Sequence, residues 1–159
     1  MRRGDLERFV GDLAGPVERF TRESGVRLVL LINASGQVLA QRGFARATDV
    51  MGVAALGAGI HASSRAIAAL LGQPAFHHLH QGGGTEQVFI GSFSTPAEEL
   101  ILVAVFGEDS SIGLVRVFFE TLTQEVARLP GWSEARPTAD AAAFERDLEA
   151  GLEHFFGSR

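Results

Sequence analysis

Apolar residues recur every three or four positions in four stretches of the chain, and this spacing predicts four amphipathic helices. The expected helices cover residues 5–23, 49–71, 110–129 and 139–156. Pro16 lies inside the first of them, so we expect a kink there or two shorter helical pieces. Residues that commonly stop a helix follow each stretch, at Gly25, Gly72, Pro130 and Gly157.

Five shorter stretches with strand-like patterning predict a β-sheet. They cover residues 26–33, 37–41, 75–81, 86–94 and 98–106. The first and the last are apolar on both faces, which is typical of central strands. The second and third contain more polar residues and suit the edges of a sheet. Because the connections are short, we expect antiparallel hairpins within a single sheet.

The predicted elements follow the order helix, two strands, helix, three strands and helix, with a further helix appended. This mixture of hairpins and helices belongs to the α/β class in the broad sense, and to α+β more narrowly. We expect one domain over residues 1–130, followed over residues 131–159 by a linker and a C-terminal amphipathic helix. That last helix carries five acidic residues against one arginine. It could cover the core or contact a partner.

The predicted helix 49–71 carries two apolar stripes. The larger side chains, which we expect to face the sheet, are Val53, Leu56, Ile60, Ile67 and Leu70. The smaller residues are Ala55, Ala58, Gly59, Ala62, Ala66 and Ala69. Because the first stripe already accounts for the sheet contact, we interpret the second as a surface for close contact with another helix. The alternative is tight packing against the domain's own sheet.

Three histidines, His77, His78 and His80, lie in the polar strand 75–81. On a strand His78 and His80 share one face, but two ligands are too few for a metal without help from elsewhere. We favour a solvated edge strand and expect no metal site. An exposed edge must be blunted or paired. Pairing with the same strand of a second copy would extend the sheet across a two-fold axis.

Composition narrows the function classes. The 159-residue chain has no cysteine, which excludes disulfides and thiolate catalysis, and its net charge of −5 disfavours non-specific nucleic-acid binding. No apolar run approaches the roughly 20 residues of a membrane span, so we expect a cytoplasmic protein. The glycines at 82–84 lack the Lys-Ser/Thr of a phosphate loop. No nucleophile signature is present, and we expect neither an active site nor a cofactor.

Several segments together resemble the roadblock/dynein-light-chain family. They are the hairpin LLINASGQVLAQRG, the small-residue helix ending in ALLG, and the strand series HQGGG, VFIGSF and LILVAVF. The resemblance runs from about Gly4 to Leu129. It implies an αββαβββα fold with a five-stranded antiparallel sheet in the order 2-1-5-4-3 and helices on both faces. It also implies a homodimer joined through the third strands, here His77, His78, Leu79, His80 and Gln81, with the second helices paired.

Bacterial members of this kind act on a small Ras-like GTPase. The resemblance implies that one GTPase is held across the dimer, and that hydrolysis is accelerated by repositioning the GTPase's own residues without an arginine finger. The implied partner-binding residues on the second helix are Ala55, Ala58, Gly59, Ala62, Arg65 and Ala66. Those on the C-terminal helix are Phe144, Leu148, Leu152 and Phe155. The resemblance further implies a role in cell polarity.

Two other functions remain open from the sequence. One is a scaffold of the same fold that binds a GTPase without changing its turnover. The other is a ligand-sensing module, which should hold an internal polar cavity. The sequence offers few candidates for buried polar residues, so we rank the sensor last.

Overall fold

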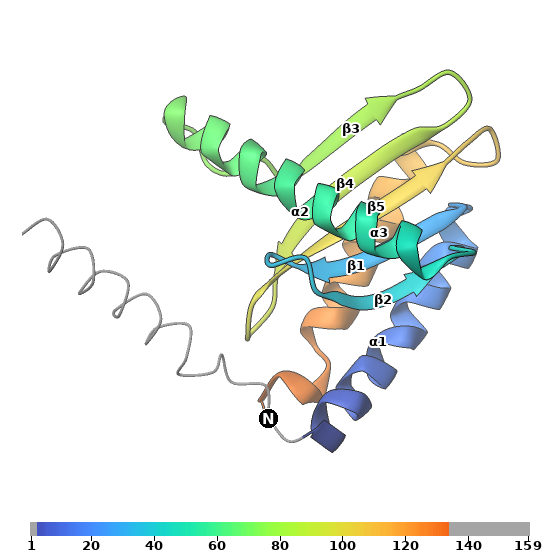
Figure 1. Cartoon of the computed structure of the whole chain (residues 1–159), viewed down its shortest axis with the longest axis vertical. Helices are drawn as coiled ribbons and strands as arrows, with labels where there is room; N and C mark the ends of the chain where they lie inside the picture. The colour runs from blue at the N-terminus through green and yellow to red at the C-terminus, as the bar shows by residue number, and fades with distance from the viewer. Residues whose placement is uncertain (1–2, 134–159) are drawn as a thin grey trace, which may run out of the picture.

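An antiparallel sheet separates two helical layers in the computed structural model, which describes residues 3–133 (Figure 1). The helices α1 and α3 cover one face of the sheet, and α2 crosses the other face. The helices are α1 (Arg3–Ser24), α2 (Ala47–Leu70), α3 (Ile112–Ala127) and the short 3₁₀ helix η1 (Pro130–Ser133). The strands are β1 (Leu28–Asn33), β2 (Val38–Arg42), β3 (His78–Gly82), β4 (Gln87–Ser94) and β5 (Glu99–Phe106).

The five strands form one sheet in the order β2-β1-β5-β4-β3, with antiparallel neighbours throughout. This confirms the predicted fold. The central pair aligns Leu30 with Val103, and the edge pair aligns His80 with Phe89. Apolarity ranked the strands correctly, because only a strand covered on both faces can be apolar on both.

The face under α1 and α3 holds the main hydrophobic core. Its buried side chains come from both helices and from all the strands except β3. The largest fully buried ones include Phe89, Phe106, Leu13, Leu31 and Leu102. Alternate residues of β1 and β5 point to this face, and the residues between them point to α2.

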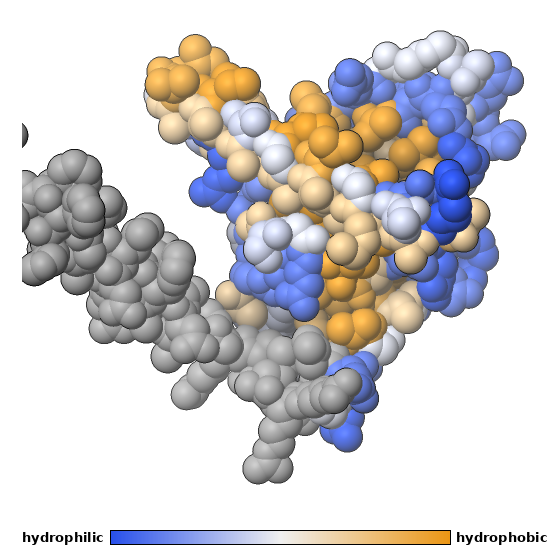
Figure 2. All heavy atoms as spheres, viewed as in Figure 1, coloured by the Kyte–Doolittle hydropathy of each residue, from blue (hydrophilic) through white to orange (hydrophobic). Residues whose placement is uncertain are grey.

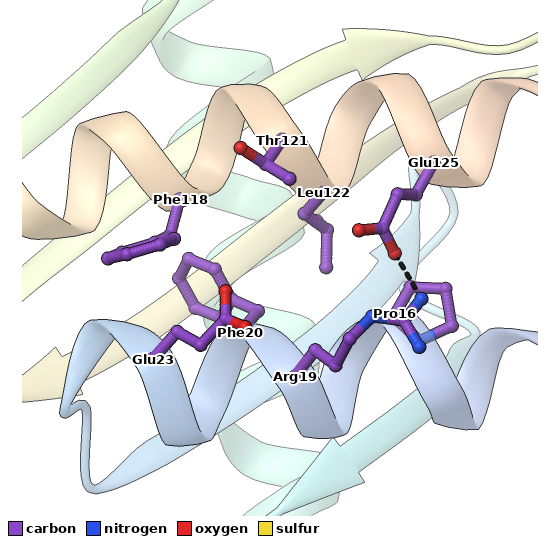
Figure 3. Close-up of a pocket in the computed structure, with 8 residues that line it drawn as sticks. All are labelled: Pro16, Arg19, Phe20, Glu23, Phe118, Thr121, Leu122 and Glu125. Carbon is purple, nitrogen blue, oxygen red and sulfur yellow. Dashed lines mark hydrogen bonds and ion pairs between the residues drawn. The ribbon is translucent and has the colours of Figure 1, made fainter.

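The helix α1 is continuous across Pro16, so the expected division into two pieces is wrong. A proline inside a helix loses one backbone hydrogen bond, but here Pro16 is buried where α1 meets α3. Figure 3 shows it between the two helices, next to the ion pair that joins Arg19 of α1 to Glu125 of α3. This packing compensates for the local loss.

The packed domain extends into the segment that the sequence predicts as a linker. In η1 the Trp132 side chain is buried, and its ring meets that of Phe9 edge-on with centroids 4.3 Å apart. Its indole N–H donates to the carbonyl of Val126. The described chain therefore ends against α1, on the α3 side of the sheet.

The helix α2 is long and apolar enough to cross a membrane by length and composition alone. This corrects the expectation that no stretch approaches a membrane span. A helix packed within a folded domain can meet the same criteria, and α2 buries Ala54, Gly57 and Ala68. The large apolar side chains of α2 form an exposed surface beside β3.

Candidate partner-binding surface

Small residues of α2 face the sheet, contrary to the expectation that its large apolar stripe would do so. Ala54, Gly57 and Ala68 are buried. A Cβ added at Gly57 would lie 3.0 Å from Cγ2 of Val103 and 3.7 Å from Cδ1 of Ile32. The backbone of α2 therefore lies close to β1 and β5 at Gly57, whereas the larger side chain of His61 is buried further along the helix.

The predicted core stripe is consequently turned away from the sheet. Leu56 is 69% exposed, Ile67 52% and Leu70 87%, so their assignment to the core is wrong. Ile60 is also exposed, and only Val53 packs against the sheet cluster as predicted.

Three of the exposed side chains line an apolar groove of about 540 Å³ between α2 and β3. Leu56, Ile60 and Ile67 form its α2 side, and Phe76 and Leu79 form the opposite side. Figure 2 shows the hydrophobic surface running along this side of α2 to the end of the helix. An exposed apolar patch of this kind usually marks an interface. Phe76 was not among the predicted contacts, although it is an aromatic residue just before the edge strand.

The small residues assigned to partner binding follow a neighbouring side of α2, where Ala55 and Gly59 also border the groove. Ala55, Gly59, Ala62 and Ala66 are exposed and follow one another at helical spacing. Ala58 differs from them, because it is half-buried and packs against the sheet cluster. Without large side chains, this surface allows another backbone to approach closely.

Arg65, the remaining predicted contact on α2, is held by an acid of its own chain. Its guanidinium forms an ion pair with Glu99 at the start of β5. The same carboxylate lies 3.4 Å from Nε2 of His61, a residue that is 7% exposed. This Nε2 atom makes no hydrogen bond within residues 3–133. The role of Glu99 could not be found from the sequence, because nothing local links it to a helix more than thirty residues earlier.

The edge strand β3 is exposed along its whole length. His78 stacks on Phe89 and His80 on Phe106, so both imidazoles lie on the α1/α3 face as the strand alternation predicts. Leu79 points to the other face, into the groove beside α2. In the sheet β3 pairs with β4 alone, so its outer edge can accept another strand.

Two of the three buried polar residues in the described chain stabilise the fold through hydrogen bonds. Ser24 Oγ donates to the carbonyl of Phe20. The Asn33 carboxamide oxygen accepts from the backbone N–H groups of Ser35 and Gln37 and so shapes the β1–β2 turn. The third buried polar residue is His61. Within residues 3–133 no cluster of three His, Cys, Asp or Glu side chains could hold a metal ion.

The C-terminal candidates Phe144, Leu148, Leu152 and Phe155 lie outside the described residues.

The sheet order, the two helical layers and the exposed surface of α2 define a roadblock-type domain. The sequence profile of the Roadblock/LC7 domain matches residues 16–106, more than half of the chain, and the chain therefore belongs to that family. No curated protein matches it.

Among solved structures, the chain is similar to MglB. The gliding protein MglB from Thermus thermophilus is 29% identical with a TM-score of 0.62, over 80% of this chain and 92% of that one. An MglB with a tetrameric arrangement is 28% identical with a TM-score of 0.65, over 85% and 95%. MglB from Myxococcus xanthus shares the fold at 23% identity and a TM-score of 0.66, over 73% and 92%.

Proposed function

We propose that this protein is a homodimeric regulator of a small Ras-like GTPase similar to MglA, and that it accelerates GTP hydrolysis. The observation that carries the proposal is the surface of α2. One side of the helix exposes large apolar residues beside an unpaired strand edge, and another exposes a row of small residues. The two sides suit two different contacts, and the family membership supports this division.

The first contact is with a second copy. Pairing of two β3 strands through His77, His78, Leu79, His80 and Gln81 would satisfy the open backbone groups of the edge. It would also bring together two apolar grooves and cover Leu56, Ile60 and Phe76. The strand edge and the groove lie next to each other, so one interface accounts for both.

The second contact is with the GTPase, on the small residues of the paired α2 helices. Hydrolysis needs an oriented water and stabilised charge on the transferred phosphate. The small side chains of Ala55, Ala62 and Ala66 can act neither as a base nor as a nucleophile, and Arg65 is paired with Glu99. The regulator therefore acts by favouring one arrangement of the GTPase's own switch loops, which is a shift in population.

We also propose that the C-terminal segment contacts the GTPase and that the protein acts in the cytoplasm. Phe144, Leu148, Leu152 and Phe155 form a second contact with the GTPase. The complex acts in the cytoplasm and takes part in cell polarity.

The test is single-turnover GTP hydrolysis by a Ras-like GTPase encoded in the same genome, with and without this protein. We expect acceleration, and we expect Ala62→Arg to abolish both the acceleration and the complex while the fold stays intact. A long cation cannot enter a close contact between helices. The matched control is Ala47→Arg, at an exposed position at the start of the same helix.

The alternatives give different results. A complex that forms without acceleration would indicate a scaffold. Unchanged binding by the Ala62→Arg variant would remove the small-residue surface from the proposal, and absence of any complex would contradict GTPase regulation altogether.

A further inference from the structure

A second groove lies on the opposite face of the sheet, between α3 and β3. It has a volume of about 340 Å³. Residues of α3, β4 and the start of β3 line it, among them His77, His78, Phe93, Arg116, Phe119 and Glu120. Because α3 lies over the middle of the sheet (Figure 1), it leaves this side of β3 uncovered. Strand pairing at the β3 edge would leave the groove open, since it lies on the face of the sheet.

The floor of this groove is aromatic and firmly packed. The Phe119 ring meets Phe89 and Phe93 edge-on, with centroids 5.1 Å and 5.9 Å away. A Cβ added at Gly91 would lie 2.7 Å from Cζ of Phe119, so the glycine lets this ring rest on the strand. Apolar side chains that entered the groove would therefore meet a preformed surface.

The rim of the groove carries mainly basic groups. Arg116, His77 and His78 line it, against the single acid Glu120. The pKa of His78 is lowered from its ordinary value, first by burial and then by the nearby Arg116, His77 and His80. The second cause is repulsion from the neighbouring positive charge, which lowers this pKa less than burial does. Carboxylates placed over the rim would relieve this repulsion.

The chain itself contains a segment of complementary chemistry, outside the described residues. Over residues 139–156, four apolar residues recur at helical spacing, and five acids face one arginine. As a helix, this segment would place Glu145 and Asp147 on the two borders of the apolar stripe. The partner that fits an aromatic floor with a basic rim is an acidic amphipathic helix of this kind.

The length of chain also suffices. The described part ends at η1, on the α3 side of the sheet. The ten residues 134–143 can span up to about 33–36 Å when extended, whereas the whole 16-residue helix α3 is only about 24 Å long. The segment before Phe144 is therefore long enough to run the length of α3, which forms one side of the groove.

We propose that residues 139–156 of each chain dock as a helix in the α3–β3 groove of the same chain. The apolar stripe packs on Phe93 and the edge of Phe119, which rest on the buried Phe89, and the bordering acids face Arg116 and the two histidines. Docking hides the stripe that the proposed function assigns to the GTPase contact. The groove and the GTPase therefore compete for the segment, and the free protein keeps it covered.

Spin-label distance measurements on the full chain test the proposal directly. Because the natural chain has no cysteine, labels at Gln124→Cys and Ala150→Cys would be the only ones present. Gln124 is exposed on α3, and Ala150 lies opposite the apolar stripe of the predicted helix. With labelled chains diluted in unlabelled protein, we expect one narrow distance distribution. A broad distribution would overturn the proposal.

Reversing the charge of Arg116 tests whether the segment docks in this groove. Arg116→Glu should turn the narrow distribution into a broad one, and adding Asp147→Arg or Glu145→Arg should restore it. Arg22→Glu, an equal charge change at an exposed position on α1, should have no effect. A narrow distribution that survives Arg116→Glu would contradict docking at this rim.

Mixing two singly labelled chains distinguishes the source of the segment. A narrow distance between chains would show that the partner copy supplies the helix, and would contradict docking within one chain. The measurement contains no GTPase, so its failure and the failure of the proposed function are separate results.

Discussion

The two faces of the sheet differ in how well the chain's own side chains cover them. The face under α1 and α3 buries eighteen residues in one cluster, which includes Phe and Trp side chains from both ends of the described chain. The face under α2 buries six, and α2 approaches it through alanine and glycine. Most of the large apolar residues that the described chain exposes lie on α2, on the loop after it and on β3. Apart from the groove between α3 and β3, the first face is filled by side chains of the described chain, whereas the second leaves large apolar side chains exposed.

Replacing a leucine by alanine on each of the two faces should give the largest difference in the free energy of unfolding. Leu122→Ala in α3 removes a side chain that is 2% exposed, and should lower the free energy of unfolding by about 2–5 kcal/mol. Leu70→Ala at the exposed end of α2 should change it by less than about 0.5 kcal/mol. Urea titration of both variants measures the difference. Equal losses would show that the α2 face is also complete.

A charge in the open groove should affect assembly more than folding. Leu79→Asp would place a carboxylate in the apolar interface of the proposed dimer and should raise the dissociation constant by about 100-fold, or roughly 2.7 kcal/mol. Analytical ultracentrifugation would detect the monomer. Val117→Asp is the control, because Val117 is also apolar and exposed but lies on α3. If both variants remained dimeric, the β3–α2 interface would be excluded.

Gly57 lies on the side of α2 that faces the sheet, and Gly52 lies on an open side. Gly57→Val would drive a side chain into Val103 and should destabilise the fold by about 1–3 kcal/mol. Gly52 has no atom within 4 Å of an added Cβ, so Gly52→Ala should stabilise the helix by about 0.5–1 kcal/mol. Thermal unfolding should therefore shift in opposite directions. A shift in the same direction would contradict the close approach of α2 to the sheet.

The smallest effect is expected at Arg65. Because Glu99 of the same chain holds its guanidinium, Arg65→Ala should change the accelerated rate of GTP hydrolysis by less than about threefold. Removal of an arginine finger would cost about 10³–10⁵-fold. Single-turnover hydrolysis separates these values widely. A loss of the larger size would assign Arg65 to the GTPase active site.

The helix α2 shows where prediction from sequence stops. Its existence and approximate range followed from periodicity, and its row of small residues indicated close packing. The sequence carries two apolar stripes, however, and neither of them is the side that faces the sheet, because the buried residues Ala54, Gly57 and Ala68 lie outside both. The side that faces the sheet depends on the space above it, which Ile32 and Val103 occupy from two separate strands.

Features that depend on a short segment could therefore be predicted from the sequence, and features that depend on contacts between distant segments could not. Hydrophobic periodicity, turn residues and the ranking of strands by apolarity are properties of short segments, and they predicted the element order, the central strands and the exposed edge. The full sheet order was predicted only from the resemblance to the family. Only the tertiary structure decided how α2 is rotated, that Trp132 closes the core against Phe9, and that Glu99 joins His61 to Arg65. Each of these depends on atoms that distant parts of the chain bring together, and no spacing within one segment encodes such distances.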